Sequence, residues 1–407
     1  MAATSTPLDL GLYQDLQRFG ATDISACFSC GTCTASCPLV ETDGAFPRRI
    51  IRYAQLGMKD ALLSSKELWS CYQCGDCSDT CPTEADPSEF MAAARRYAIA
   101  SYDRTHIARA MYTRPIVGTI LAVALAALFA LFMYSAHGPQ DGSTLAIFEF
   151  IPEELIHNMG IVVMIIVVFA GLAGVATMAR AIGRREGVGW GTVFGSRRAL
   201  ARSGRAAWDA IGRESLGQVR FRAECETEPA TGVSASTPVA PVAAVAWYRR
   251  RGFVHAVTVW GFLGLLLATG LDYGLALVGI KETGTPVPIW YPVRLLGTVA
   301  GAMLVYGVIV LIVDRYRASN ASVRRSTTAD WMLLGLLLVT GVTGFVLELA
   351  LYLPGVPVWG YWVFLVHVAV AMELVLLAPF MKLAHAVYRP VALFFVALAR
   401  LPEGDPS

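Results

Sequence analysis

The chain has 407 residues, of which 55% are hydrophobic and only 16% are charged. Charged residues alone make up about a quarter of an average soluble protein, so this composition excludes an ordinary soluble globular protein and indicates a membrane protein. The formal net charge of +2 offers no bulk electrostatic reason to expect binding to nucleic acid.

The first 112 residues are predicted to form a small, mostly helical domain outside the membrane. Residues 1–25 lack the basic, apolar and small-residue succession of a secretory signal, so we expect the N-terminus in the cytoplasm. Eight of the nine cysteines lie before residue 82. Clustered cysteines in a reducing compartment indicate metal ligation rather than disulfides.

Two cysteine runs share the spacing C-x2-C-x2-C-x3-C-P, which is typical of bacterial ferredoxins with two [4Fe–4S] clusters. The first three thiolates of a run bind one cluster, and the fourth binds the other. Gly31 and Gly75 suit the tight backbone around the clusters. The alternative is a pair of structural zinc sites, which have no use for the third and fourth cysteines at these offsets. The predicted ligands are Cys27, Cys30, Cys33 and Cys81 for the first cluster, and Cys71, Cys74, Cys77 and Cys37 for the second.

Six apolar stretches follow, and each has about the twenty residues that a helix needs to cross a bilayer. The segment between the second and third stretches is rich in arginine, and so is the loop after the fourth, whereas the opposite loops carry only Lys281. Cytoplasmic loops carry the excess of Lys and Arg, so we expect a multi-pass protein of the prokaryotic inner membrane with both termini and the iron–sulfur domain in the cytoplasm. The stretches lie near 115–134, 155–179, 253–279, 290–313, 330–353 and 359–381.

Two features of the arginine-rich linker are open to interpretation. Residues 196–212 set apolar side chains against arginines, which fits either a helix lying on the inner leaflet or a solvated basic helix. Residues 224–245 are rich in Ala, Pro, Thr, Ser and Val, and we expect a flexible connector. Cys225, within that connector, has no companion cysteine and is interpreted as a free thiol.

Four of the six histidines lie within or at the edge of predicted spans. An imidazole is costly in a membrane unless it has a partner, and haem iron is the obvious one. His367 and His385 are eighteen residues apart, which is five turns or about 27 Å of one helix, so two stacked haems would fit. His255 and His385 both lie at the inner edge and would bind an inner haem. His367 and His157 are paired by elimination for an outer haem; the alternative for each histidine is an interfacial residue bonded to water or backbone.

The chain resembles the membrane component of the quinone-interacting membrane-bound oxidoreductase, which is similar to the C subunit of heterodisulfide reductase fused to a b-type cytochrome like the E subunit of that enzyme. The resemblance rests on the two cysteine motifs, from Cys27 and from Trp69, and on the final Pro379-Phe-Met-Lys-Leu-Ala-His-Ala-Val-Tyr-Arg389. Spans two to six also resemble the gamma subunit of respiratory nitrate reductase. That protein has a second histidine ten residues after the equivalent of His255, where this chain has Leu265, so a single haem stays possible.

The resemblance implies exchange of electrons with menaquinone or ubiquinone in the bilayer. Carboxylates inside spans are expensive unless they are paired or relay protons, and Glu348 is the first candidate among them. Long basic side chains at the same level could bind haem propionates or the quinone headgroup, or could simply extend to the interface. The quinone and proton candidates are Glu348, Asp272, Glu373, Lys281 and Arg294, while Lys382 and Arg389 are candidates for propionates of the inner haem.

The predicted fold is therefore mostly α-helical, with a two-cluster ferredoxin-like domain followed by a six-span helical bundle of cytochrome b type. We divide it into the iron–sulfur domain (1–112), two spans (113–180), a basic linker (181–252), a four-span haem b bundle (253–390) and a cytoplasmic tail (391–407).

This organisation predicts an electron-transfer subunit that links cytoplasmic flavin or iron–sulfur subunits to two clusters, haem b and membrane quinone. A flavin or nucleotide site would belong to those partners, because the sequence has no Gly-rich nucleotide loop. The alternative is a cluster-bearing membrane anchor that docks a partner and has neither haem nor its own quinone site. A transporter or redox sensor would have Gly/Pro-broken spans, whereas the spans here are continuous apart from Pro379.

Overall fold

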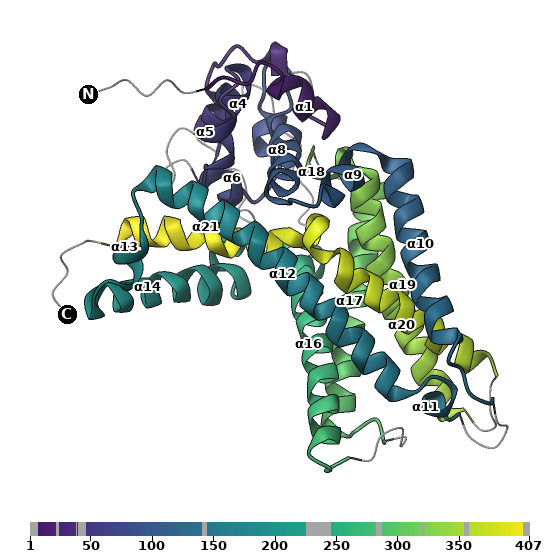
Figure 1. Ribbon diagram of the computed structural model, residues 1–407. Helices are drawn as coiled ribbons and strands as arrows, with labels where there is room; N and C mark the ends of the chain where they lie inside the picture. Colours follow the sequence, from purple (N-terminus) through teal and green to yellow (C-terminus); the bar gives the residue numbers. More distant parts are fainter. Residues whose placement is uncertain are drawn as a thin grey trace.

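The computed structural model describes residues 7–21, 24–37, 39, 46–140, 145–224, 246–281, 287–318, 321–353 and 358–401. Throughout these residues the regular structure is helical and no strand occurs, so the predicted mostly α fold is confirmed. Short helices form a compact domain at one end of the molecule, and long apolar helices extend away from it (Figure 1).

The iron–sulfur domain is organised around one buried helix, α8 (Pro87–Tyr102). The Asp86 side chain accepts a hydrogen bond from the backbone N–H of Glu89, and Pro87 occupies the first helical position, where its missing N–H costs nothing. Phe90 and Tyr97 are fully buried against the surrounding short helices. These are α1 (Leu12–Arg18), α2 (Thr32–Ala35), α4 (Arg48–Gln55), α5 (Lys59–Leu63), α6 (Glu67–Ser70), α7 (Asp76–Asp79) and α9 (Ile107–Thr113), with the 3-10 turn η1 (Ile24–Ala26).

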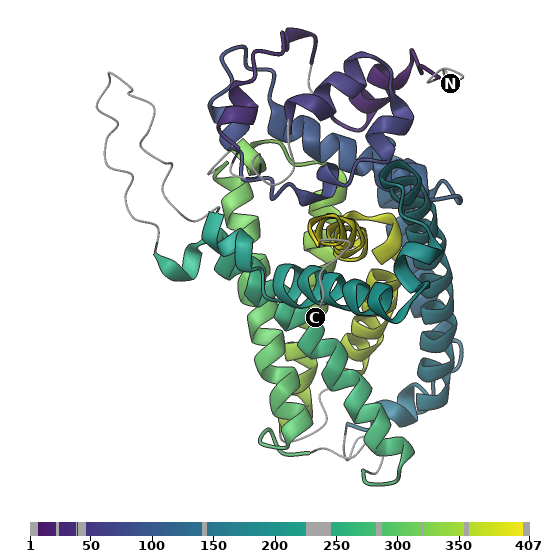
Figure 2. The same cartoon turned by 90° about the vertical axis from the view of Figure 1, so that its left-hand side faces the viewer.

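Seven helices among the described residues are long and apolar enough to cross a membrane, one more than the six stretches predicted. Six of them coincide with those stretches: α10 (Pro115–Tyr134), α12 (Glu153–Glu186), α16 (Arg251–Leu277), α17 (Pro292–Tyr316), α19 (Thr328–Tyr352) and α20 with its 3-10 end (Trp359–Phe380). The seventh is the segment Lys382–Arg400, which contains α21 (His385–Arg400). In Figure 1 it runs crosswise between the iron–sulfur domain above it and α14 below it, and it is seen end-on in Figure 2.

One expectation about the last span was wrong, because His367 and His385 do not share a continuous helix. α20 ends at Leu377 and is followed by two 3-10 turns, η4 (Ala378–Phe380) and η5 (Lys382–Ala384), before α21 begins. Pro379 lacks a backbone N–H and clashes with the preceding turn, and Met381 between the two turns is extended, with φ −114° and ψ −173°. The chain therefore changes direction between the two histidines.

The arginine-rich linker is helical where it is described, and it packs against α21. It contains α13 (Trp190–Phe194), α14 (Arg197–Trp208), the π-helix η2 (Asp209–Leu216) and α15 (Val219–Glu224), and a 3-10 turn, η3 (Trp247–Arg249), precedes α16. α14 and η2 contact α21, and Arg202 donates to the Leu398 carbonyl (2.9 Å). The connector 225–245, with Cys225, lies outside the described residues.

The predicted domain boundaries fall inside helices rather than between them. The boundary at 180 lies within α12, the boundary at 252 lies within α16, and the boundary at 390 lies within α21. Since α21 continues to Arg400, residues 391–400 belong to the folded structure and not to a separate tail.

A single apolar core joins the iron–sulfur domain to the membrane helices. Tyr388 of α21 packs against both Trp69 and Tyr102, with its ring centroid 5.4 Å from each of theirs. Met178 and Ile182 of α12 belong to the same buried cluster. The domain is therefore seated on α21 and on the adjoining end of α12.

Candidate iron–sulfur and histidine sites

The two cysteine motifs have the same backbone conformation. Gly31 and Gly75, each directly after the second cysteine, have φ of +94° and +102° and precede α2 and α7. This left-handed conformation favours glycine because it has no Cβ. Ser29 and Gln73, directly before the same cysteines, also have positive φ, at 61° and 55°. The hydroxyls of Ser36 and Thr80 meet at 3.1 Å, so residues at matching positions of the two motifs also contact each other.

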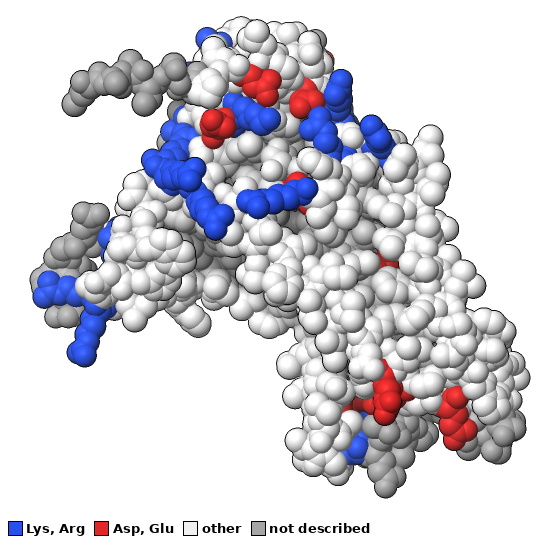
Figure 3. Space-filling view, viewed as in Figure 1, with Lys and Arg blue, Asp and Glu red and all other residues white. Residues whose placement is uncertain are grey.

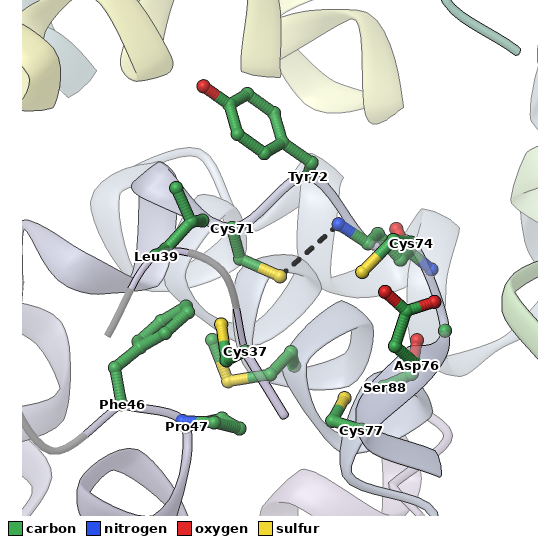
Figure 4. A pocket seen from close by; sticks show the side chains of 13 residues that line it. Cys37, Leu39, Phe46, Pro47, Cys71, Tyr72, Cys74, Asp76, Cys77 and Ser88 are labelled. Carbon is green, nitrogen blue, oxygen red and sulfur yellow. Dashed lines mark hydrogen bonds between the residues drawn. The ribbon is translucent and has the colours of Figure 1, made fainter. Parts of the chain in front are cut away.

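Cys37 of the first motif lies with the first three cysteines of the second motif. The four sulfur-bearing side chains of Cys37, Cys71, Cys74 and Cys77 line one hollow (Figure 4). The Gln73 backbone N–H donates to the Cys71 sulfur at 3.3 Å. Burial, with a smaller contribution from the nearby thiolates of Cys71 and Cys74, raises the pKa of Cys37 to about 12. A site that buries several thiolates needs cationic partners such as iron.

The complementary group is formed by the other four cysteines. Burial raises the pKa of the Cys33 thiol, and the neighbouring thiolates of Cys27, Cys30 and Cys81 add to this increase. Cys30 is exposed, and hydrogen bonding to Thr32 lowers its pKa. The assignment of these four cysteines to one cluster stays a prediction.

Among the described residues, no three His, Cys, Asp or Glu side chains lie close enough to hold a single metal ion.

His255 and His385 come together from α16 and α21, with ring centroids 6.4 Å apart and an interplanar angle of 54°. His385 Nδ1 lies 2.6 Å from the Lys382 carbonyl oxygen. A carbonyl can only accept, so Nδ1 must carry the proton and Nε2 keeps its lone pair. In the described part of the chain, the buried Nδ1 of His255 has no hydrogen-bond partner.

The turn that carries the Lys382 carbonyl is held by a second contact. Lys382 Nζ donates to Asp330 of α19 at 2.7 Å, and Asp330 also accepts from the backbone and hydroxyl of Thr327. This capping box at the start of α19 fixes the carboxylate, which in turn fixes the Lys382 turn beside His385.

The two histidines predicted for an outer site have different neighbours in the structure. His367 Nδ1 lies 3.0 Å from the Thr343 hydroxyl of α19, which itself donates to the Val339 carbonyl. His157 packs on the Tyr273 ring of α16 at 4.1 Å and lies 3.7 Å from Glu153. Their pairing stays a prediction.

Four of the quinone and proton candidates form two ion pairs at the end of the bundle away from the iron–sulfur domain. Glu348 accepts from Arg294 Nε (3.1 Å) and from the Thr298 hydroxyl (2.9 Å). Asp272 accepts from Lys281. Charged side chains are visible at this end of the molecule in Figure 3. Ion pairing satisfies these four groups structurally, while the fifth candidate, Glu373 of α20, is 2% exposed.

The residues that sequence reasoning missed are arginines next to the second cysteine motif. Arg95, Arg251 and Arg389 all donate to backbone carbonyls between Leu68 and Cys74. A carbonyl acceptor leaves no trace in the sequence, so only the fold could identify these contacts. The sequence alone suggests Arg389 only for haem propionates.

The cysteine grouping, the ligand spacing and the apolar helices together define an iron–sulfur electron-transfer protein with seven helices, in the described part of the chain, that are able to span a membrane. Residues 23–85 match the 4Fe-4S dicluster domain family. No solved structure matches the chain significantly.

The matching curated relatives are C subunits of heterodisulfide reductases. The C subunit of the H(2):CoB-CoM heterodisulfide,ferredoxin reductase of Methanothermobacter thermautotrophicus is 37% identical over 62 residues, which are 15% of this chain and 34% of the relative. The iron-sulfur C subunit of the CoB–CoM heterodisulfide reductase of Methanopyrus kandleri is 46% identical over 46 residues, 11% of this chain and 24% of the relative. The chain spans about a third or less of the length of these relatives.

Proposed function

We propose that the chain is the membrane-anchored electron-transfer subunit of a multi-subunit oxidoreductase, moving electrons between a cytoplasmic redox partner, two [4Fe–4S] clusters, haem b and membrane quinone. The observation that carries this proposal is the meeting of His255 and His385 beside the second cysteine motif. Each histidine lies four residues from an arginine that bonds this motif.

His255 and His385 are the residues that would hold the haem iron, and their ring centroids are 6.4 Å apart. Metal-bound histidines also commonly donate their other N–H to a carbonyl, as His385 does to Lys382. A bound haem would supply a one-electron acceptor and donor here.

We assign the first cluster to Cys27, Cys30, Cys33 and Cys81 and the second to Cys71, Cys74, Cys77 and Cys37. The crossed grouping of the thiols supports this assignment. The identical spacing of the two motifs and the matching backbone turns at Gly31 and Gly75 support it as well.

Quinone exchange belongs at the opposite end of the bundle, near the Arg294–Glu348 and Lys281–Asp272 pairs. Ion pairs at this level could bind a polar headgroup and take up or release its protons. An outer haem between His367 and His157 would connect the two ends. For His367, the Thr343 hydroxyl supports a ligand role, since it holds the proton on Nδ1 and leaves Nε2 with its lone pair.

The proposed location is the prokaryotic inner membrane with the iron–sulfur domain in the cytoplasm. Arginine-rich segments on the side of that domain support this orientation. The relatives are named as subunits of heterodisulfide reductases, so the partners we propose are cytoplasmic flavin or iron–sulfur subunits. These features and the sequence resemblance to a b-type cytochrome support the proposed kinship with quinone-interacting oxidoreductases.

The test is a reduced-minus-oxidised absorbance spectrum of the purified full chain. We expect a b-type haem band that is lost or strongly reduced in a His385→Ala variant, while the iron–sulfur absorbance stays unchanged. A well-behaved wild-type protein without this band would contradict the proposal and favour the alternative, a cluster-bearing anchor that docks a partner.

A further inference from the structure

Arginines from α16 and α21 hold the backbone of the second cysteine motif. Arg251, at the start of α16, donates to the carbonyls of Gln73 (2.9 Å) and Cys74 (2.7 Å). Arg389 of α21 donates to the carbonyls of Trp69 (3.0 Å) and Cys71 (3.1 Å), and its guanidinium lies 4.5 Å from the Tyr72 ring centroid. Hydrogen bonds from a charged donor are roughly twice as strong as neutral ones.

The first cysteine motif has no such contact with the membrane helices among the described residues. Its Cys27 carbonyl accepts from Gln55, a neutral side chain of the iron–sulfur domain itself (2.9 Å). Phe28 follows Cys27 as Tyr72 follows Cys71, but Phe28 is 67% exposed, whereas Tyr72 packs on Arg389 and Phe221. The two clusters therefore face different surroundings: the first motif faces outward and the second faces the bundle.

The same arginines are tied to the histidine pair by helical spacing. Arg389 is four residues after His385 on α21, and Arg251 is four residues before His255 on α16. Side chains four apart lie on one helix face. Each histidine is thus one helical turn from the arginine that bonds a ligand-bearing loop.

We infer that Arg251 and Arg389 are positioning residues that couple the second cluster to the histidine pair, so that this cluster, and not the first, exchanges electrons with the membrane cofactor. The inference rests on the proposed function. One electron leaves one centre and enters the other in each transfer; no bond forms or breaks and no proton moves. The first cluster is then left to exchange electrons with the soluble partner.

Loss of either arginine should have two measurable consequences. Each guanidinium stabilises the more negative, reduced form of the nearby cluster, so removing one should lower the midpoint potential of the second cluster. Each arginine also holds the backbone of residues 69–74 against the bundle through hydrogen bonds to carbonyl groups. Removing one arginine should therefore increase hydrogen exchange of the backbone amides in this segment.

The first experiment compares hydrogen–deuterium exchange of residues 69–77 in the full-length protein in detergent. We expect Arg251→Gln and Arg389→Gln to speed exchange on the order of tenfold, since each removes charge-assisted hydrogen bonds. The matched control is Arg185→Gln: Arg185 of α12 also bonds the iron–sulfur domain, through the Ala61 carbonyl (2.6 Å) and the Tyr53 hydroxyl (2.7 Å), but away from the cysteines. This control should leave residues 69–77 unchanged.

The second experiment mixes the oxidised protein with dithionite in a stopped-flow instrument and records the rate of haem reduction. A redox titration measures the midpoint potentials of both clusters. The two glutamine variants should lose most of the fast phase of haem reduction and lower the potential of the second cluster only. Arg251→Lys and Arg389→Lys keep the positive charge but lose the planar guanidinium that donates two parallel hydrogen bonds. They should therefore keep the midpoint potential of the second cluster and retain only part of the fast phase of haem reduction. Arg185→Gln should keep both.

Failure of the inference and failure of the proposed function give different results. If the wild-type protein contains haem but both glutamine variants match Arg185→Gln in exchange, rate and potential, the coupling role is wrong and the proposed function stands. If the wild-type protein contains no haem, the proposed function fails. The coupling role then fails with it, even where amide exchange shows that the arginines hold the loop.

Discussion

The eight clustered cysteines are nearly identical in local sequence, so their roles depend on what the fold places around each one. Cys37 stands only four residues after Cys33, yet Cys33 has Cys27, Cys30 and Cys81 as neighbours, whereas Cys37 lines the hollow of the second motif. The turn that ends α2 separates the two directions. The proposed assignment therefore places Cys37 in a different cluster from the other three cysteines of its motif.

Paired cysteine substitutions test this crossed assignment. We expect Cys37→Ser and Cys71→Ser each to lose roughly half of the bound iron, because each removes a ligand of the second cluster. The double variant Cys37→Ser/Cys71→Ser should lose no more than either single one, whereas Cys37→Ser/Cys27→Ser should lose nearly all. Iron content per chain and the EPR spectrum of the reduced protein measure this.

The control for the cysteine series is Cys225→Ser, which lies in the linker and should keep the full iron content. The opposite pattern, with Cys37→Ser/Cys27→Ser equal to either single variant, would show that each motif binds one cluster on its own.

At the scale of helices, the packing of the iron–sulfur domain on α12 and α21 depends on a close approach of these two helices to each other. A Cβ added at Gly174 of α12 would lie 2.0 Å from the Tyr388 hydroxyl. Tyr388 is only 4% exposed and packs against two other aromatic rings, so it has little room to move. Overpacking of this kind commonly costs about 1–3 kcal/mol.

Gly174→Ala should therefore lower the thermal stability of the full chain in detergent, while Gly171→Ala should leave it unchanged or raise it slightly. Gly171 lies on the same helix with nothing within 4 Å of its Cβ position, and Ala is favoured over Gly in helices by up to about 1 kcal/mol. Adding Tyr388→Phe to Gly174→Ala removes the clashing oxygen and should recover part of the loss. Equal melting temperatures for the two alanine variants would rule out this packing role.

Hydropathy found six of the seven long helices, because a span needs only a continuous apolar run. It could not find the change of direction after Leu377. Pro379 marks the position, but a proline can either kink a helix or end it, and here the Lys382–Asp330 pair and the burial of Tyr388 favour ending it.

In the sites, too, local features could be predicted from the sequence, whereas long-range contacts could not. The cysteine ligands are encoded in local spacing, and Gly31 and Gly75 could be assigned from the conformations that only glycine adopts freely. The pairing of His255 with His385 was expected from their common level, and the structure does place the rings together. The contacts of Arg251 were out of reach, since they join backbone carbonyls to a side chain more than 170 residues away.

On the scale of the whole molecule, the crosswise course of α21 decides the topology. Seven helices of the described chain are apolar enough to cross a membrane. One of them, α21, runs crosswise between the iron–sulfur domain and α14 (Figures 1 and 2), and it contacts both α14 and η2. Three of its six buried residues, Tyr388, Ala392 and Phe395, belong to the same core as Trp69 and Phe90. A helix packed into that core cannot also be surrounded by lipid.

Six crossings place both ends of the chain on one side of the membrane, whereas seven would place them on opposite sides. We expect a reporter that is active only in the cytoplasm to be active when fused after Ser407 and when inserted in the 225–245 connector, and inactive when inserted at residues 282–286 between α16 and α17. The reason is that α21 is held by the hydrogen bond from Arg202 to the Leu398 carbonyl and by the packing of Tyr388 on Trp69. Neither contact is compatible with insertion of α21 across the bilayer. The connector insertion serves as the control for cytoplasmic location. An inactive reporter after Ser407, with an active one in the connector, would mean that α21 crosses the membrane and that the iron–sulfur domain is seated differently.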